Sequence, residues 1–466
     1  MKTVLMSLSS QAVFRNLFFF PGSFFDRAHG FLEQHHDHRL VILVPSRVRE
    51  KYMPIIGDKL HERLLLIPAD IPPRNTWLQK AFIFLYSYLI YTGTTKIMAT
   101  LGTRPDEPPA GGNWYLSPIK IAIARTLGRL RFMKRTVVPF LFMRIFKERP
   151  FEVFFTTYRP ERVFVPHLYG WFDQLLLAEA KRQKIASIGM PAGWDHLDKY
   201  FLPLHPDILL AQSEQVAEHA VEFQAYDKSQ IRVTGYPHFD FISNNSFARS
   251  RGETLDNLGM PANAKYFLYV SGSGYCPDEP DVIETMLKWM DEGKFGTDVR
   301  LVIRPYLGGR SKDKEFDEEK FNRFESHPRV KFYRPDFWGD IEKSKDFINI
   351  MRHADAVLAV FTTMVLEASV LDRPLVALVF DGYHTRPLRR SIRRFEAFTH
   401  FREVRKTGAM KTAYSFDELY AILDRYLKDP SYGAKERQLL REQLCYTLDG
   451  KASERILKHV FPDMIG

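Results

Sequence analysis

Residues 354–380 read ADAVLAVFTTMVLEASVLDRPLVALVF, and this stretch decides the fold of the chain. An apolar run at 356–360 is followed by two threonines, by apolar residues at helical spacing, by a polar turn and by a second apolar run at 375–380. This order predicts a strand, a helix and a second strand, the βαβ unit of a parallel sheet. Phosphate groups bind at such helix N-termini, just beyond the carboxyl end of the first strand.

The side chains at the start of this helix suggest a nucleotide site. Thr362 and Thr363 offer hydroxyl groups to a diphosphate. Glu367 lies one helical turn further on nearly the same face, where a carboxylate could hold a ribose diol. The alternative is that a threonine only caps the helix and Glu367 is a solvated helix residue.

Length and composition predict a folded protein of two domains. The chain has 466 residues, of which 45% are hydrophobic and 26% charged, and this is too long for one ordinary core. Its two cysteines, Cys276 and Cys445, exclude a disulfide framework and a zinc ribbon. No signal peptide is evident, and the longest apolar run, 81–91, is about half of what a bilayer requires. We expect a cytoplasmic protein, soluble or peripheral at the inner face of the membrane.

Basic residues gather between residues 118 and 150. The net charge of the chain is +10, and in this stretch Glu148 is the only acid, while basic residues alternate with bulky apolar ones. This pattern is typical of a helical segment on an anionic membrane surface, and the alternative is a core helix with one solvated face. A second basic run, 384–394, could bind a diphosphate, lipid headgroups or acidic glycans. Nucleic acid is not an expected partner, because no recognition motif accompanies the charge.

Short apolar runs alternate with helical stretches along both halves, which predicts parallel α/β sheets. Residues 71–117 are expected to be an irregular excursion, followed by the basic helical region at 118–150. The predicted domains are 1–245, 246–440 and a C-terminal helix, 441–466, that packs back on the first domain. The expected strands are 3–7, 40–44, 64–67, 163–165 and 208–211 in the first half, and 266–270, 300–304, 330–333, 356–360 and 375–380 in the second.

Polar loops follow several of these strands, at the edge where ligands of open α/β sheets gather. In the first half, 166–173 contains His167, and 191–196 ends in Asp195 and His196. In the second half, the small-residue loop 271–274 lets a ligand approach the backbone closely. Arg304 ends a strand and could contact phosphate, although a strand-end arginine is often only an ion-pair partner at the surface.

Three strings resemble enzymes that build bacterial surface polysaccharides. VTGYPHFD at 233–240 resembles a string that closes the first half of surface-polysaccharide transferases and of UDP-N-acetylglucosamine 2-epimerase. GWDH at 193–196 is similar to a Ser-Trp-Asp-Asn loop of capsule glycosyltransferases, with His196 in place of Asn. DGKASER at 449–455 looks like a string that these transferases share with CDP-glycerol glycerophosphotransferases. The resemblance implies the GT-B fold, two Rossmann-like parallel-sheet domains that face an interdomain cleft.

The resemblance also implies a function in polysaccharide biosynthesis. It indicates a glycosyltransferase that moves a sugar from a nucleotide-sugar donor to a surface-glycan or lipid-linked acceptor, without a metal or other cofactor. An inverting reaction requires a base from the first domain, for which the candidates are Asp195, then His196, then His167. The alternatives are a CDP-linked polyol-phosphate transferase, against which Tyr306 argues because His-Pro commonly follows Arg-Pro there, and a non-catalytic nucleotide-binding protein of the same fold. The resemblance implies that Ser271, Gly272, Ser273, Thr362, Thr363 and Glu367 bind the nucleotide, and the strand-end Arg304 completes the predicted nucleotide site.

Overall fold

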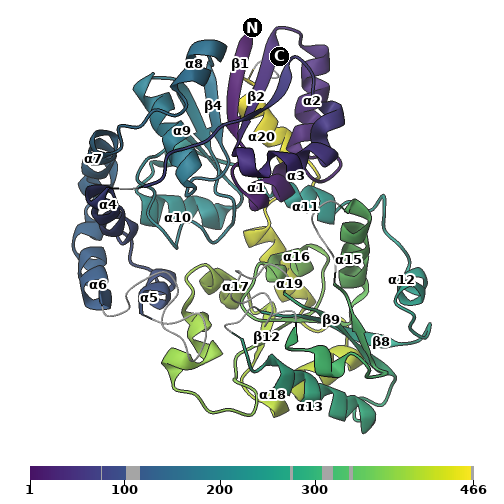
Figure 1. Cartoon of the computed structure of the whole chain (residues 1–466). Helices are drawn as coiled ribbons and strands as arrows, with labels where there is room; N and C mark the ends of the chain where they lie inside the picture. The colour runs from purple at the N-terminus through teal and green to yellow at the C-terminus, as the bar shows by residue number, and fades with distance from the viewer. Residues whose placement is uncertain (75, 101–115, 273–275, 307–318, 335–339, 463–466) are drawn as a thin grey trace. The chain divides into compact units, whose positions relative to one another are not determined.

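The computed structural model describes residues 1–74, 76–100, 116–272, 276–306, 319–334 and 340–462 (Figure 1). The chain divides into two compact units, each built on its own parallel sheet. The first unit comprises Met1–Thr95, Pro118–Phe241 and Tyr446–Gly466, and the second comprises Lys96–Ser117 and Ile242–Cys445. The two sheets confirm the predicted pair of Rossmann-like α/β folds.

The sheet of the first unit has seven strands in the order β3-β2-β1-β4-β5-β6-β7. All neighbours pair in parallel, and the central strands are apolar runs because helices cover both faces. The strand order reverses at β1, so the carboxyl ends of β1 and β4 lie next to each other at a switch point of the kind where ligands bind. The strands are β1 (Lys2–Ser7), β2 (His38–Val44), β3 (Leu64–Pro68), β4 (Arg162–Val165), β5 (Ala186–Gly189), β6 (Ile208–Ala211) and β7 (Ile231–Val233).

The helices of the first unit include a group outside the α/β alternation. Residues 71–117 were expected to be irregular, but their described part contains α4 and α5, so that expectation was wrong there. A capping box formed by Thr76 and Gln79 starts α4. The helices are α1 (Gln11–Leu17), α2 (Phe24–Gln34), α3 (Ser46–Ile56), α4 (Trp77–Ser87), α5 (Gly93–Thr100, which continues into the second unit), α6 (Ser117–Arg125), α7 (Val138–Ile145), α8 (Glu152–Tyr158), α9 (Trp171–Arg182), α10 (Glu214–Gln224), α11 (Pro237–Ile242) and α20 (Ala452–Val460), with short turns η1 (Gly57–Lys59), η3 (Leu127–Arg129), η4 (Met133–Val137, a π-helix) and η5 (Lys228–Gln230).

The sheet of the second unit has six strands in the order β10-β9-β8-β11-β12-β13. The stretch 354–380 forms β11, α16 and β12, as predicted. The edge strand β13 was not expected, because only the first and last of its four residues are buried. The elements are β8 (Lys265–Val270), β9 (Val299–Arg304), β10 (Val330–Phe332), β11 (Ala356–Ala359), β12 (Leu375–Leu378), β13 (Met410–Ala413), α12 (Arg251–Asn257), α13 (Glu279–Asp291), α15 (Ile341–His353), α16 (Met364–Val370), α17 (Phe401–Thr407), α18 (Phe416–Lys428), α19 (Ala434–Leu444), η6 (Asn322–Phe324), η7 (Leu388–Arg390) and η8 (Ile392–Ala397).

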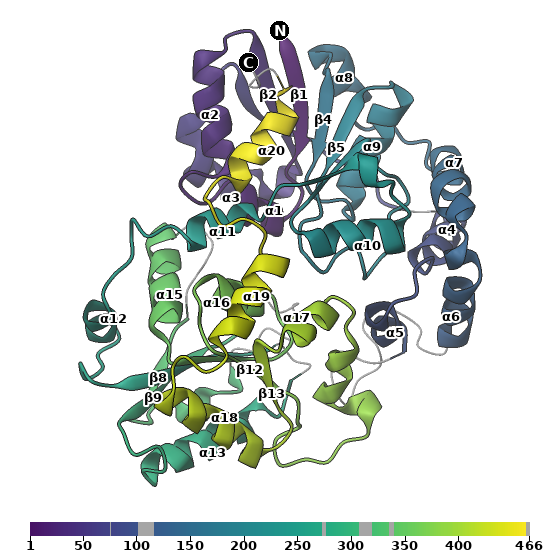
Figure 2. The same ribbon diagram turned by 180° about the vertical axis from the view of Figure 1, so that it is seen from behind.

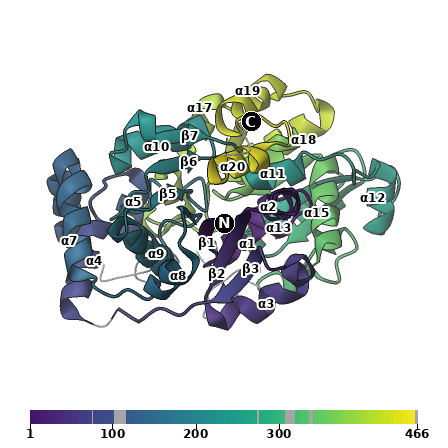
Figure 3. The ribbon, with the colours of Figure 1, turned by 90° about the horizontal axis from the view of Figure 1, so that it is seen from above.

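The C-terminal helix α20 packs against α2 of the first unit, and all three views show the two helices side by side (Figures 1, 2 and 3). Asp240 caps α20 by accepting hydrogen bonds from the backbone N–H groups of Ala452 and Ser453 at 3.0 and 2.8 Å. Arg455 donates from Nε to the carbonyl oxygen of Thr234 at 2.7 Å. Two of the three strings behind the resemblance therefore meet here, where they fix the C-terminal helix.

Candidate functional site

Three strand ends meet at the carboxyl edge of the second sheet. Val270 of β8 pairs with Arg304 of β9 and with Ala359 of β11, so the loops after these strands start side by side. Gly272 is in close contact with the end of β11, because a Cβ atom there would lie 2.8 Å from a methyl carbon of Val360. Only glycine fits at this position without moving its neighbours.

The start of α16 lies at this edge and carries the predicted threonines. Thr362 Oγ1 accepts a hydrogen bond from the N–H of Met364 at 3.2 Å, so Thr362 does form a cap. Thr363 is exposed, and its side chain makes no capping hydrogen bond. Glu367 is only 9% exposed, so its interpretation as a solvated helix residue was wrong. Two of the predicted polar side chains therefore lie at this end of α16, one exposed and one buried one turn further on.

The other predicted nucleotide residues hold the neighbouring loops. Ser271 is buried, and its Oγ accepts a hydrogen bond from the N–H of Tyr306 at 2.8 Å, which ties the loop after β8 to the loop after β9. The guanidinium carbon of Arg304 lies 5.0 Å from the centre of the Phe347 ring. Ser273 lies outside the described residues. The nucleotide-binding roles of these residues remain predictions.

A buried ion pair that the sequence did not reveal fixes Gly272. Its N–H donates to Glu279 Oε1 at 2.9 Å, and its carbonyl accepts from Lys320 Nζ at 2.7 Å. Glu279 and Lys320 pair at 2.7 Å, and their side chains are 3% and 2% exposed. Burial raises the pKa of the Glu279 carboxyl, and the ammonium group of Lys320 opposes that shift. The pair lies 41 positions apart in sequence, and Glu279 alone reads as an ordinary first-turn acid.

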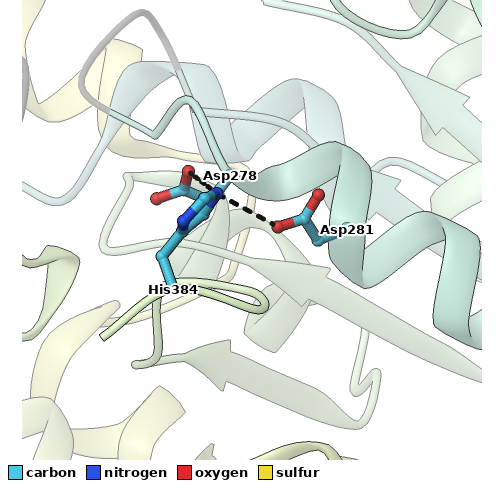
Figure 4. A group of neighbouring side chains, drawn as sticks. All are labelled: Asp278, Asp281 and His384. Carbon is cyan, nitrogen blue, oxygen red and sulfur yellow. Dashed lines mark ion pairs between the residues drawn. The ribbon is translucent and has the colours of Figure 1, made fainter. Parts of the chain in front are cut away.

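Asp278, Asp281 and His384 form the group among the described residues whose ligand atoms are close enough to hold a metal ion (Figure 4). His384 extends from the segment after β12 toward both carboxylates at the start of α13, with Nε2 3.7 Å from Asp278 and 3.9 Å from Asp281. Arg386 already binds Asp278 through two nitrogens at 3.0 Å each, and Asp281 accepts from the N–H of Tyr383 at 3.1 Å. The guanidinium of Arg386 supplies the positive charge that a metal ion would bring to Asp278. These contacts therefore hold the segment after β12 against the start of α13.

The first unit holds a second set of polar residues, where β1 and β4 end. Asp173, fully buried at the start of α9, accepts hydrogen bonds from Ser7 Oγ and Ser9 Oγ, each at 2.5 Å. Its Oδ2 lies 3.4 Å from Nδ1 of His167, which is also 3.2 Å from Ser9 Oγ. A carboxylate beside Nδ1 orients the ring and leaves Nε2 as the proton acceptor. The His167 side chain remains 21% exposed, so it can reach a substrate.

Asp195 and His196 lie in the loop after β5, near this pair. Asp195 forms an ion pair with Lys199 one turn further along the chain. The rings of His196 and His167 have centres 6.1 Å apart, and Tyr169 donates a hydrogen bond to the carbonyl of His196. Burial lowers the pKa of His196 to about 4. The structure therefore brings together the three predicted base candidates and adds Asp173, Ser7 and Ser9, which sequence reasoning missed.

Comparisons with known proteins find one family model that matches part of the chain and several solved structures with a similar fold. A family model described as CDP-glycerol:poly(glycerophosphate) glycerophosphotransferase matches residues 320–462. No curated protein matches the chain in sequence. Among solved structures, the UDP-N-acetylglucosamine 2-epimerase of Neisseria meningitidis bound to UDP-GlcNAc is 13% identical, with a TM-score of 0.56, and the match covers 99% of this chain and 100% of the epimerase.

Two further solved structures have a similar fold. A glycosyltransferase of Rickettsia africae is 10% identical, with a TM-score of 0.52 and 98% of both chains covered. The UDP-GlcNAc 2-epimerase of Methanocaldococcus jannaschii is 13% identical, with a TM-score of 0.51 and 100% of both chains covered. These findings confirm the predicted resemblance and the GT-B type of fold. The family model supports the prediction of a transferase.

Proposed function

We propose that this chain is a glycosyltransferase that moves a sugar from a nucleotide-sugar donor to a surface-glycan or lipid-linked acceptor. The observation that carries the proposal is the row of strand ends in the second unit. It puts Arg304, at the end of β9, on the same edge of the sheet as the start of α16, with β8 between them. The UDP-GlcNAc complex of the Neisseria epimerase supports a nucleotide-sugar donor on this fold. We further propose that the enzyme works in the cytoplasm, peripheral at the inner face of the membrane.

On the donor side, the protein must stabilise the diphosphate that leaves. The guanidinium of Arg304 and the hydroxyl of Thr363 are the groups of this edge that would face it, and Glu367 would accept hydrogen bonds from the ribose. Donors aimed at developing negative charge can contribute several kcal/mol, roughly 3 to 4 for one oxyanion donor. In this proposal these groups stabilise the leaving diphosphate without a metal or other cofactor.

On the acceptor side, we assign the base to His167 rather than to Asp195. Asp195 is engaged by Lys199, and His196 is a weak base because burial lowers its pKa to about 4. His167 is oriented by Asp173 and partly exposed. In an inverting transfer, Nε2 of His167 takes the proton of the acceptor hydroxyl as its oxygen bonds to the anomeric carbon, and the bond from that carbon to the diphosphate breaks.

The test is nucleotide binding and transfer with matched variants. UDP, GDP and CDP are added singly to the protein, and melting temperature and affinity are measured. We expect one of them to stabilise the protein, and Glu367→Gln to weaken its binding about tenfold. Glu342→Gln, which changes an exposed acid in the first turn of α15, is the control. Unchanged nucleotide affinity in the Glu367 variant would refute the site.

The second candidate is a transferase of a CDP-linked polyol phosphate. The match of residues 320–462 to the glycerophosphotransferase family model favours it. It predicts that CDP stabilises the protein more than UDP or GDP does, and that the product carries a phosphodiester. A third outcome, binding without turnover of any donor, would point to a non-catalytic protein of this fold.

A further inference from the structure

Helices α4, α6 and α7 form a packed group of the first unit that lies beyond α9 and α10 in Figures 1 and 2. On its inner side, Phe82 and Tyr86 of α4 contact Phe146 and Phe142, with ring centres 6.2 and 6.4 Å apart. Gly128 after α6 sits against the end of α4, where a Cβ atom would lie 2.7 Å from the carbonyl oxygen of Leu89. The group is therefore a fixed part of the fold.

This group also exposes large apolar side chains. Helix α4 is apolar almost all round, since Lys80 is its one charged residue. Such a helix is normally buried in protein or in lipid. Trp77 is 80% exposed and Phe132 67%. The exposed apolar residues of the group, which we call the outer surface, are Trp77, Leu78, Ile119, Leu130, Phe132 and Phe140.

Positive charge accompanies these residues without matching acids. The described residues 76–100 and 116–147 contain no Asp or Glu. Arg131 and Arg135 pair with Asp227, which leaves the exposed Arg129, Arg144 and Lys147 of this segment with no carboxylate partner among the described ion pairs. The guanidinium of Arg144 lies 5.1 Å from the centre of the Phe140 ring, so charge and aromatic surface are adjacent.

We propose that the outer surface docks on a membrane that carries anionic lipid headgroups. Trp, Phe and Leu side chains enter the interface between headgroups and acyl chains, and neighbouring arginines bind the anionic headgroups. A second copy of the chain is a poorer occupant, because a symmetric contact would bring like charges together. No described helix has the length and hydropathy to cross a bilayer, and docking needs none.

This proposal names the residues that produce the peripheral membrane association proposed above. It rests on the proposed function only for which face of the membrane the protein binds. Its test is co-sedimentation of the full chain with vesicles of phosphatidylcholine alone or mixed with phosphatidylglycerol. One variant combines Trp77→Ser with Phe132→Ser, and another combines Arg129→Glu with Arg144→Glu. The controls are Val153→Ser on α8 (60% exposed) and Lys288→Glu on α13, whose side chain is 71% exposed.

We expect binding to the phosphatidylglycerol vesicles that falls as salt is raised. Each arginine replaced by glutamate should weaken this binding at least about fivefold. The apolar variant should bind both kinds of vesicle more weakly, while the controls bind normally. Equal binding of the variants and the parent, or no binding at all, would overturn the proposal. A dimer that is detected by light scattering and is lost in the variant with Trp77→Ser and Phe132→Ser would also overturn the proposal. Nucleotide binding in solution should be the same in these variants as in the parent. This measurement separates a failure of membrane docking from a failure of the proposed function.

Discussion

Asp173 lies directly against His167, with its Oδ2 atom 3.4 Å from Nδ1 of the imidazole. The carboxylate is fully buried, and the hydroxyls of Ser7 and Ser9 each donate a hydrogen bond to it. Its position is therefore fixed by β1 as well as by α9. A buried, fully bonded carboxylate next to one nitrogen of a partly exposed imidazole gives the ring one orientation, which a base requires.

Asp173→Asn is expected to reduce kcat by about 100-fold or more, because the amide no longer holds the ring in its basic tautomer. The substrate KM should change little. Asp195→Asn is the matched control, and we expect it to cost far less. The measurement is the pH profile of kcat for both variants. A larger loss for Asp195→Asn would instead support the order of bases predicted from the sequence.

Gly170→Ala is expected to disturb the same pair by steric contact. A Cβ atom at this position would lie 2.0 Å from Asp173 Oδ2 and 2.9 Å from His167 Nδ1, so one of the two side chains must move. Transfer should fall at least about tenfold, as displacements of 1 Å can cost 100-fold. Gly30→Ala, in α2 with nothing within 4 Å of the new Cβ, is the control and should be neutral or slightly stabilising. Comparable activity of the two variants would contradict the role of the pair.

The sequence predicted the sheets better than it predicted the sites. Apolar runs located most strands, and the βαβ unit at 354–380 was confirmed, because burial on both faces leaves a clear signal. Helix α4 was missed because its apolar run was judged only as a membrane segment. Asp173 could not be found from sequence, since Ser7 and Ser9 lie 166 and 164 positions away and meet it only through the pairing of β1 with β4.

Lys320→Met is expected to destabilise the second unit by about 3 to 5 kcal/mol, because Glu279 then stays buried without a cation. The double variant with Glu279→Gln should lose less than the sum of the two single variants. The exposed pair Lys345 and Glu342 is the comparison, where Lys345→Met should cost less than about 1 kcal/mol. Urea unfolding of the four variants measures the free energies. Equal costs at the two pairs would show that the pair around Gly272 is not isolated from water.

Stability is expected to fall as the pH drops below about 6.5, through two buried imidazoles of the first unit. Burial lowers the pKa of His205, which stacks on Tyr226 with ring centres 4.3 Å apart, to about 3, and the pKa of His196 to about 4. Between these values and about 6.5 the unfolded chain binds protons that the folded chain does not, so acid favours unfolding. The stabilisation from the neutral rings is complete above about pH 6.5 and is lost as the pH falls toward the folded pKa values.

His205→Phe removes one of these imidazoles and keeps the stacked ring. It should flatten the acid side of the curve by at most about 1.4 kcal/mol per pH unit, the slope of one proton. Urea unfolding between about pH 7 and about pH 4 measures this slope. His36→Gln, at an exposed position, should leave it unchanged. If His205→Phe keeps the full slope, its imidazole binds protons equally in the folded and the unfolded chain, and the acid sensitivity must come from other groups.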